Sequence, residues 1–480
     1  IIDVALSLLA THKVKIFTSH CSPSHSFPET QDGTLDVTVV GDFLPRHFCH
    51  RGYALFAYLR MLYVSLYVTL FHSADVVICD TISFPIPLLK LVAPVIFYCH
   101  FPDKLLCTDR QSFLKRLYRL PIDWIEGVTT KQADILFVNS KFTQNIFSAS
   151  FPDIRPLPRV LYPPLSLTKF DQPLPNSSET LSSLSSSLLP SSSIPTDNPK
   201  WVYKKQPNNK EYFPSKFLLS INRFERKKNV QLALEAFAYL LKQFPSSMGD
   251  DLSLILAGGY DLRVTENVEY ALELNQMAVD LGIRERVFFL FSFSDAQKLY
   301  LLRNCLCVLY TPSNEHFGIV PVESMYCEVP VIAVNNGGPT ESISHGVTGY
   351  LCDPNGESFG AAVGEALGFE LGEKEGEKKE GKKEGKKEGK KGRELKMDPE
   401  EGEKEPANSG DLINEMRKKR FRRVLSPSST LKRLSSGEMS AIDFRNSMNT
   451  MTHEEVASVT QMLYECLEKE EEEKKEKEKQ

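Results

Sequence analysis

Short apolar segments rich in β-branched and aromatic residues alternate with helical patterns through two long stretches of the chain. This alternation is typical of parallel strands connected by crossover helices, and it predicts an α/β fold. Helices are expected at residues 1–10, 53–71, 230–241, 262–281, 295–304, 318–327 and 357–367. Strands are expected at 14–17, 37–40, 76–79, 95–100 and 135–139, and again at 217–222, 252–257, 287–291, 307–310 and 329–333.

A Ser-rich stretch interrupts the alternation, and its composition is unsuited to a packed core. We therefore expect two doubly wound Rossmann-like domains that face each other across a cleft, with disordered insertions. Ligands bind such folds at the carboxyl ends of the strands. The expected segments are an N-terminal Rossmann-like domain (1–171), a Ser-rich linker (172–212), a C-terminal Rossmann-like domain (213–367), a low-complexity insertion (368–435), a helical segment (436–470) and a charged tail (471–480).

The first residues have a helical pattern, whereas a doubly wound domain opens with a strand and a glycine turn. We therefore expect the first strand of the N-terminal domain to be missing. The net charge of −5 and the absence of basic residues interleaved with aromatics argue against a nucleic-acid partner. Ten cysteines are scattered without C-x-x-C pairs, which indicates a reducing compartment without a disulfide framework.

Residues 53–71 form the longest apolar stretch, and they include Arg60 and several tyrosines. Three interpretations remain open for this segment. It is a buried crossover helix, a helix lying in a membrane interface, or a helix that spans the membrane.

Two glutamates eight positions apart, Glu315 and Glu323, flank a loop that leads from an expected strand into an expected helix. Carboxylates in this arrangement suit hydrogen bonding to the vicinal hydroxyls of a sugar or a ribose. The helix begins near Gly318 and Ile319, where free backbone amides and the positive end of the helix favour an anion. Each glutamate alone would be read as an acid at a helix start that only complements the helix dipole.

Further candidates follow neighbouring strands. The glycine pair Gly337 and Gly338 is expected to form a second anion-binding turn, and Gly258 and Gly259 are expected to allow close approach of a ligand. In a reaction that releases a diphosphate leaving group, nearby cations stabilise the negative charge of that group as it departs. The candidate cations are Arg223 and Lys228, which could also be no more than surface residues of a helix-start loop.

His100 ends an expected strand of the first domain and is predicted to point into the cleft, although an isolated histidine is often only a core residue. The chain contains no Asp-x-Asp pair, the arrangement through which many enzymes hold a nucleotide diphosphate by a metal. We therefore expect catalysis without a metal and without a cofactor.

At these residues the sequence resembles family 4 glycosyltransferases of the GT-B fold, whose signature is a Glu, seven residues, and a second Glu. It more closely resembles the eukaryotic mannosyltransferases of asparagine-linked glycosylation. The resemblance covers most of residues 1–170 and 212–365. It is carried by the runs Tyr98-Cys-His-Phe-Pro-Asp103, Ser220-Ile-Asn-Arg-Phe-Glu-Arg-Lys-Lys-Asn229 and Leu309-Tyr-Thr-Pro-Ser-Asn-Glu-His-Phe-Gly-Ile-Val-Pro321.

This resemblance implies transfer of mannose from GDP-mannose, with retention of configuration, to a dolichol-pyrophosphate-linked oligosaccharide. The second and third mannoses would be added in α-1,3 and α-1,6 linkage at the cytosolic face of the endoplasmic reticulum membrane. Glu315 would bind the transferred mannose and Glu323 the ribose. Arg223 and Lys228 would hold the diphosphate, and His100 would act near the transferring sugar.

Two alternatives to this function remain open. The family's opening strand and its Gly-Gly-Ala-Glu-like loop are missing, which favours a non-catalytic scaffold for other glycosyltransferases. The second alternative is a GT-B enzyme that acts on a soluble acceptor. Other glycosyltransferases of the same pathway are candidate partners, as is the membrane surface.

Overall fold

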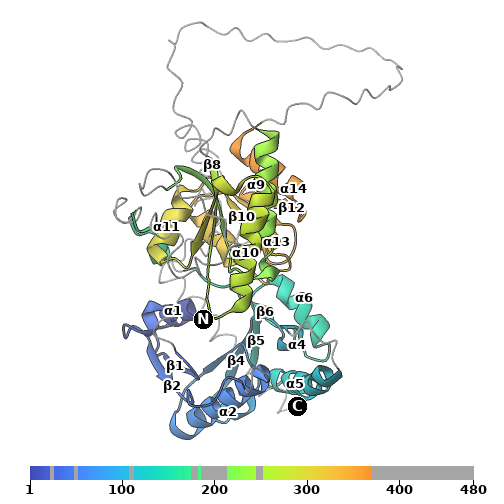
Figure 1. Ribbon diagram of the computed structural model, residues 1–480. Helices are drawn as coiled ribbons and strands as arrows, with labels where there is room; N and C mark the ends of the chain where they lie inside the picture. The colour runs from blue at the N-terminus through green and yellow to red at the C-terminus, as the bar shows by residue number, and fades with distance from the viewer. Residues whose placement is uncertain are drawn as a thin grey trace, which may run out of the picture.

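The computed structural model describes residues 1–21, 26–47, 52–106, 113–165, 167–173, 182–184, 213–244 and 252–369. These residues form two units, one above the other in Figure 1. The N-terminal unit carries strands β1 to β6, and the C-terminal unit carries β7 to β12. The expected segments 436–470 and 471–480 lie outside the described residues, as do residues 370–435 of the expected insertion 368–435 and most of 172–212.

The C-terminal unit is built on a six-stranded parallel sheet in the order β12-β11-β10-β7-β8-β9. Its strands are apolar and almost entirely buried, as expected where helices cover both faces of a parallel sheet. One core lies between the sheet and helices α9, α10 and α14, and the other includes residues of α11 and α12. The strands are β7 (Lys216–Ile221), β8 (Leu252–Gly258), β9 (Val287–Phe291), β10 (Val308–Tyr310), β11 (Val331–Val334) and β12 (Gly349–Cys352). The helices are α9 (Gln231–Gln243), α10 (Thr265–Asp280), α11 (Asp295–Asn304), α12 (Ile319–Tyr326), α13 (Pro339–Ser342) and α14 (Gly356–Leu367).

The N-terminal unit contains a four-stranded parallel sheet in the order β3-β4-β5-β6 and a separate parallel pair, β1-β2. Among the described residues, no strand joins the pair to the larger sheet. The strands are β1 (Lys15–Thr18), β2 (Asp36–Val39), β3 (Val77–Asp80), β4 (Val95–Cys99), β5 (Ile135–Val138) and β6 (Arg159–Val160). The helices are α1 (Ile2–Leu8), α2 (Tyr53–Phe71), α3 (Ile86–Leu89), α4 (Asp103–Leu106), α5 (Phe113–Thr130) and α6 (Lys141–Ser150). Helix α7 (Leu167–Phe170) follows and packs against the C-terminal unit.

The two parallel sheets with helices confirm the predicted α/β architecture. Each predicted strand lies within two residues of an observed one, because buried parallel strands are short apolar runs that are easily recognised. Strands β6 and β12 were not predicted: the first has only two residues, and the second begins at a glycine. The sequence also predicts a basic helix at residues 115–119, and in the structure this helix is longer, continuing through Pro121 to Thr130 as α5.

The Ser-rich stretch differs from its prediction at one place. Residues 182–184 form a helical turn, and Leu184 is fully buried in the core beneath the C-terminal sheet. Phe170, which was assigned to the first domain, packs into the same core. Leu181, Leu184 and Leu188 recur at helical spacing, but the prediction followed the serine-rich composition and missed this contact.

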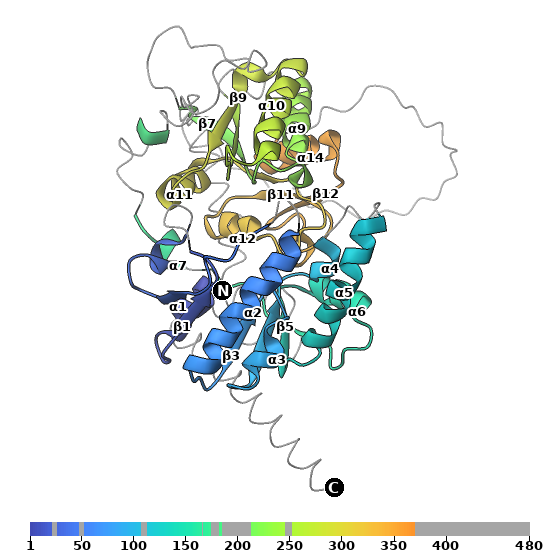
Figure 2. The same cartoon turned by 60° about the horizontal axis from the view of Figure 1, so that its bottom comes forward.

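Helix α2 is buried on one side only. Tyr58, Val64 and Val68 lie inside, and so does Arg60, which is 6% exposed and donates to Ser19 O and Asp42 Oδ1. Within the described residues, α2 is the one helix long and apolar enough to cross a membrane. The interpretation as a buried crossover helix therefore holds for the inner side of α2 only, since its outer side is open (Figure 2).

Candidate active site

The loop between β10 and α12 carries Glu315. Its carboxylate accepts a 2.5 Å hydrogen bond from Lys228 Nζ, and Lys228 ends the 3-10 helix η2 (Arg226–Lys228) that follows β7. Burial acts to raise the pKa of Glu315, but the adjacent Lys228 cation outweighs it, and the pKa lies below its ordinary value. Glu315 is therefore an ionised carboxylate held beside a cation, with 19% of its side chain exposed.

Glu323 lies in α12 and is 6% exposed. Its Oε1 atom accepts a 2.6 Å hydrogen bond from Lys298 Nζ of α11. Its Oε2 atom is buried and has no hydrogen-bond partner in the structure. A buried carboxylate oxygen without a partner is costly, so this oxygen is an acceptor ready for a ligand hydroxyl.

Tyr310, at the end of β10, lies close enough to both glutamates to feel the charge of each. Burial first, and then the charges of Glu315 and Glu323, raise the pKa of Tyr310, so its phenol stays protonated near both carboxylates. Gly318 caps α12 with a positive φ of 81°, and a Cβ there would lie 3.2 Å from the Tyr310 ring. The cap residue has no side chain to bind the first amides of α12, which begins at Ile319.

The glycine pair after β11 has a different role from the one predicted. Gly338 N donates to Glu315 O at 2.7 Å, so this amide is occupied. A Cβ at Gly337 would lie 2.6 Å from Glu315 O, and one at Gly338 would lie 2.3 Å from Phe317 O. The pair therefore allows two backbones to pack closely and holds the Glu315 loop, rather than forming an open anion-binding turn.

The other glycine pair also packs against protein. A Cβ at Gly258 would lie 1.7 Å from Asn222 O, and one at Gly259 would lie 3.4 Å from Arg223 Cγ. Arg223 itself is 61% exposed and forms an ion pair with Glu225 at 2.9 Å. The structure therefore places Arg223 beside these glycines and outside the Lys228–Glu315 pair.

On the N-terminal side, His100 directly follows β4. Its Nε2 atom lies 2.8 Å from Asp80 Oδ1 at the end of β3, and its side chain is 39% exposed. Asn139 Nδ2 donates to His100 O at 3.1 Å, which fixes the backbone of the histidine. His100 is thus a partly exposed residue at a strand end, as predicted, and not a core histidine.

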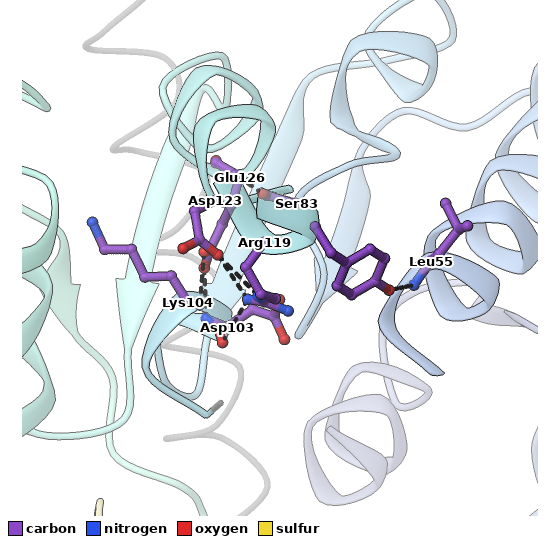
Figure 3. Close-up of polar contacts among 8 residues, drawn as sticks. Leu55, Ser83, Asp103, Lys104, Arg119, Asp123 and Glu126 are labelled. Carbon is purple, nitrogen blue, oxygen red and sulfur yellow. Dashed lines mark hydrogen bonds and ion pairs between the residues drawn. The ribbon is translucent and has the colours of Figure 1, made fainter. Parts of the chain in front are cut away.

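The loop that follows His100 is fastened to α5 by buried charges (Figure 3). Arg119, which is 5% exposed, donates to Asp103 Oδ2 at 2.9 Å and to Asp103 O at 3.2 Å, and it also binds Asp123. Glu126 accepts hydrogen bonds from Asp103 N and Lys104 N at 2.6 and 2.9 Å. Three contacts from α5 thus hold backbone atoms of Asp103 and Lys104, close to His100, and a fourth holds the Asp103 side chain.

The carboxyl ends of the two sheets meet at this point. The ring of Phe101, next to His100, stacks on His316, next to Glu315, with centroids 3.9 Å apart and planes inclined by 7°. Ser140, which follows β5, donates to His316 O at 2.5 Å. Burial first, and then the positive groups Lys228 and His100, lower the pKa of His316 against the opposing charge of Glu315.

The structure therefore brings Glu315, Lys228 and His100 to one junction, with Glu323 behind Tyr310. Sequence reasoning missed Lys298, Tyr310 and His316 as site residues. His316 could have been singled out, since it lies directly beside Glu315, but nothing in the local sequence marks Lys298. Across the described ranges, no group of three or more His, Cys, Asp or Glu side chains could hold a metal ion.

Comparison with known proteins connects this geometry to a family. The glycosyl transferases group 1 family matches residues 203–383. The chain is 47% identical over 372 residues to alpha-1,3/1,6-mannosyltransferase ALG2 of Homo sapiens, covering 76% of this chain and 82% of that protein. It is 43% identical to the protein of the same name from Dictyostelium discoideum, covering 75% and 84%. The Saccharomyces cerevisiae protein of that name is 38% identical, covering 73% and 69%.

Solved structures show the same fold at low sequence identity. Sucrose-phosphate synthase (tll1590) from Thermosynechococcus elongatus aligns with a TM-score of 0.55 at 15% identity, covering 76% of this chain and 82% of that one. Anabaena Alr3699/HepE in complex with UDP and glucose aligns with a TM-score of 0.52 at 17% identity, covering 76% and 85%. These likenesses confirm the GT-B fold, and the sequence relatives confirm the predicted resemblance. The chain belongs to the alpha-1,3/1,6-mannosyltransferase family of group 1 glycosyltransferases, and it is a mannosyltransferase.

Proposed function

We propose that this mannosyltransferase uses GDP-mannose as donor and a dolichol-pyrophosphate-linked chitobiose carrying one mannose as acceptor. It adds mannose first in α-1,3 and then in α-1,6 linkage, with retention of configuration. The observation that supports this most directly is the pair of glutamates, each bound by a lysine. A sugar nucleotide presents two sets of vicinal hydroxyls, one on the hexose and one on the ribose, and the site offers one carboxylate for each.

Glu323 suits the ribose because its unpartnered Oε2 atom is buried next to the start of α12. Glu315 suits the mannose, since it lies in the loop where the two units meet. The uncapped amides at Gly318 and Ile319 are placed to receive the diphosphate. His100 would then lie on the acceptor side, close to the transferring sugar.

Lys228 and Arg223 supply the positive charge that the departing diphosphate requires. The Lys228 ammonium has three donors, so it can bind a phosphate while it keeps Glu315. Arg223 is exposed and would have to leave Glu225 to reach the same phosphates. Because these cations serve the leaving group, we propose that transfer proceeds without a metal or a cofactor.

The acceptor is a lipid, and the exposed side of α2 fits a membrane surface. Arg60 lies on the inner side of α2 and binds protein groups, so a membrane-spanning position would break buried contacts. We therefore propose that α2 rests on the cytosolic face of the endoplasmic reticulum membrane. The residues of α2 that would contact lipid are Leu55, Leu59, Tyr63, Leu66, Leu70 and Phe71, each exposed by 39% or more.

The test is product mass after incubation of the full chain with GDP-mannose and the lipid-linked acceptor. One or two added hexoses support the proposal, and the same products should appear after exhaustive chelation of divalent ions. Products made only from UDP-glucose or ADP-glucose on a soluble acceptor would assign the chain to another GT-B activity. No transfer under any of these conditions would favour a non-catalytic scaffold.

The residue-level test is Glu315→Ala. Loss of a carboxylate that binds the transferred sugar should lower turnover at least a hundredfold. The change also leaves Lys228 without its partner, so thermal unfolding must be measured alongside activity. Glu357→Ala, an exposed glutamate at the start of α14, is the matched control and should keep full turnover. A fully active Glu315→Ala enzyme would show that Glu315 does not bind the sugar.

A further inference from the structure

The carboxylate of Glu341 reaches from the C-terminal unit into the N-terminal one. Its Oε2 atom accepts hydrogen bonds from Lys141 N at 2.8 Å and from Tyr162 Oη at 2.9 Å. Its Oε1 atom accepts a hydrogen bond from Phe142 N at 2.6 Å. One side chain thus makes three hydrogen bonds to residues 179 to 200 positions away in the sequence.

The partner of Glu341 is the first turn of α6, which has ten residues. The first amides of a helix have no intrahelical acceptor, and the N-cap residue Ser140 satisfies only Thr143 N. Glu341 satisfies the two amides that Ser140 leaves over, and its negative charge is favourable at the positive end of the helix. Figure 1 shows α6 extending from the N-terminal unit to the C-terminal unit.

On each side of the Glu341–α6 contact, a residue close by in the sequence forms a hydrogen bond to a candidate catalytic residue. On one side, Asn139 lies two positions before Lys141 and holds His100 O. On the other side, Gly338 lies three positions before Glu341 and donates to Glu315 O. A short series of backbone contacts thus runs from His100 to Glu315, in which Glu341 crosses between the units alongside the Ser140–His316 hydrogen bond and the Phe101–His316 stack.

We propose that Glu341 is a positioning residue that sets the spacing between the His100 side and the Glu315 side of the site. This proposal rests on the function proposed for those two residues. A purely structural role would be the capping of α6, with an effect on stability alone. A positioning role also predicts an effect on substrate binding, because substrates must then assemble the two sides without help from Glu341.

The test compares Glu341→Ala and Glu341→Gln with Asn355→Ala. Asn355 caps α14 by accepting a hydrogen bond from Ser358 N, so its loss removes a helix cap without touching the junction. We expect Glu341→Ala to raise the KM for donor and acceptor tenfold or more, with a smaller change in kcat at saturation. Glu341→Gln keeps one acceptor oxygen and should lie between the wild type and Glu341→Ala. Asn355→Ala should lower thermal stability and leave KM within twofold.

Amide hydrogen exchange gives a readout that needs no acceptor and no turnover. The amides of Lys141 and Phe142 should exchange at least tenfold faster in Glu341→Ala, while the amides of α14 keep the wild-type rate. Unchanged exchange at these two amides would overturn the proposal. So would faster exchange with KM within twofold of the wild type, because Glu341 would then only cap α6. If the wild type fails to use the lipid acceptor, the exchange result still tests the link.

Discussion

At the scale of single residues, the site depends on lysines that neutralise buried carboxylates. Lys298 holds one oxygen of Glu323 and leaves the other for a ligand. The two residues are 25 positions apart and meet only because α11 and α12 pack on the same side of the C-terminal sheet. We therefore regard Lys298 as part of the donor site.

Replacement of Lys298 by methionine should raise the KM for the donor tenfold or more and lower kcat less. The reason is that the buried carboxylate of Glu323 would lose its cation and the hydrogen bond that holds it in place. The loss in the free energy of unfolding should be about 1–3 kcal/mol. The measurement is steady-state kinetics together with thermal unfolding.

Two further variants make this result interpretable. Lys298→Arg keeps the charge and should restore most of the donor affinity. Lys242→Met removes an exposed lysine near the end of α9 and should change neither KM nor stability. An unchanged donor KM in Lys298→Met would mean that Glu323 does not bind the donor.

The candidate residues that the sequence predicted have local signals, whereas the residues that contact them in the fold do not. The spacing of Glu315 and Glu323 and the strand-end position of His100 are local features, so they could be recognised. The partners Lys298, Asp80 and Glu341 come from other elements, and only the folded chain brings them together. Both glycine pairs were assigned to a ligand, because their sequence signal is the same for a ligand and for a close protein backbone.

At the scale of elements, α5 carries an unusual buried acid. Burial raises the pKa of Glu126 from its ordinary 4.5 to about 7, although the amides of Lys104 and Asp103 partly offset this effect. Between pH 4.5 and 7 the unfolded chain has lost this proton while the folded chain still holds it. The free energy of unfolding therefore falls as pH rises through this window, by about 3 kcal/mol from this group alone.

Glu126→Gln should remove this pH dependence. The variant loses one of two acceptors for the amides of α4, so it should be less stable than the wild type at pH 4.5. The stability difference between Glu126→Gln and the wild type should shrink or reverse at pH 8, where the wild type carries a buried charge. Thermal unfolding at both pH values measures the difference, and the exposed Glu357→Gln serves as control. An equal difference at the two pH values would contradict a raised pKa at Glu126.

The prediction of elements worked where one pattern dominated. The predominantly apolar strands β4 and β8 are buried along their whole length, so the sequence indicated that both faces of these strands are covered. The separation of β1-β2 from the four-stranded sheet was not predicted from the strand pattern. Strand order depends on pairing between distant segments, which a single sequence does not show.

At the scale of the whole molecule, the exposed apolar residues gather on adjoining elements of the N-terminal unit. Along α5 the exposed side chains recur at helical spacing, and Trp124 is 69% exposed. Tyr118 Oη of α5 accepts a 2.8 Å hydrogen bond from Leu55 N and so joins this helix to the start of α2. The exposed residues of α5 are Leu117, Leu120, Trp124 and Val128. The inner side of α5 binds the loop next to His100 (Figure 3). A membrane that contacts the exposed sides of α2 and α5 would thus be separated from His100, the residue assigned to the acceptor side, by the width of α5.

The double variant Leu59→Glu and Trp124→Glu tests this orientation. Both side chains are exposed, so the fold should tolerate the changes, while two charges at a lipid surface oppose binding. We expect at least tenfold weaker binding to vesicles in flotation assays, and turnover of a short-chain, water-soluble acceptor within twofold of the wild type. Leu262→Glu, at a 46% exposed leucine of the C-terminal unit, should bind vesicles like the wild type. Unchanged binding by the double variant would place the membrane on another face. Loss of binding with retained turnover would show that α2 and α5 bring the site to the lipid-linked acceptor and take no part in the transfer itself.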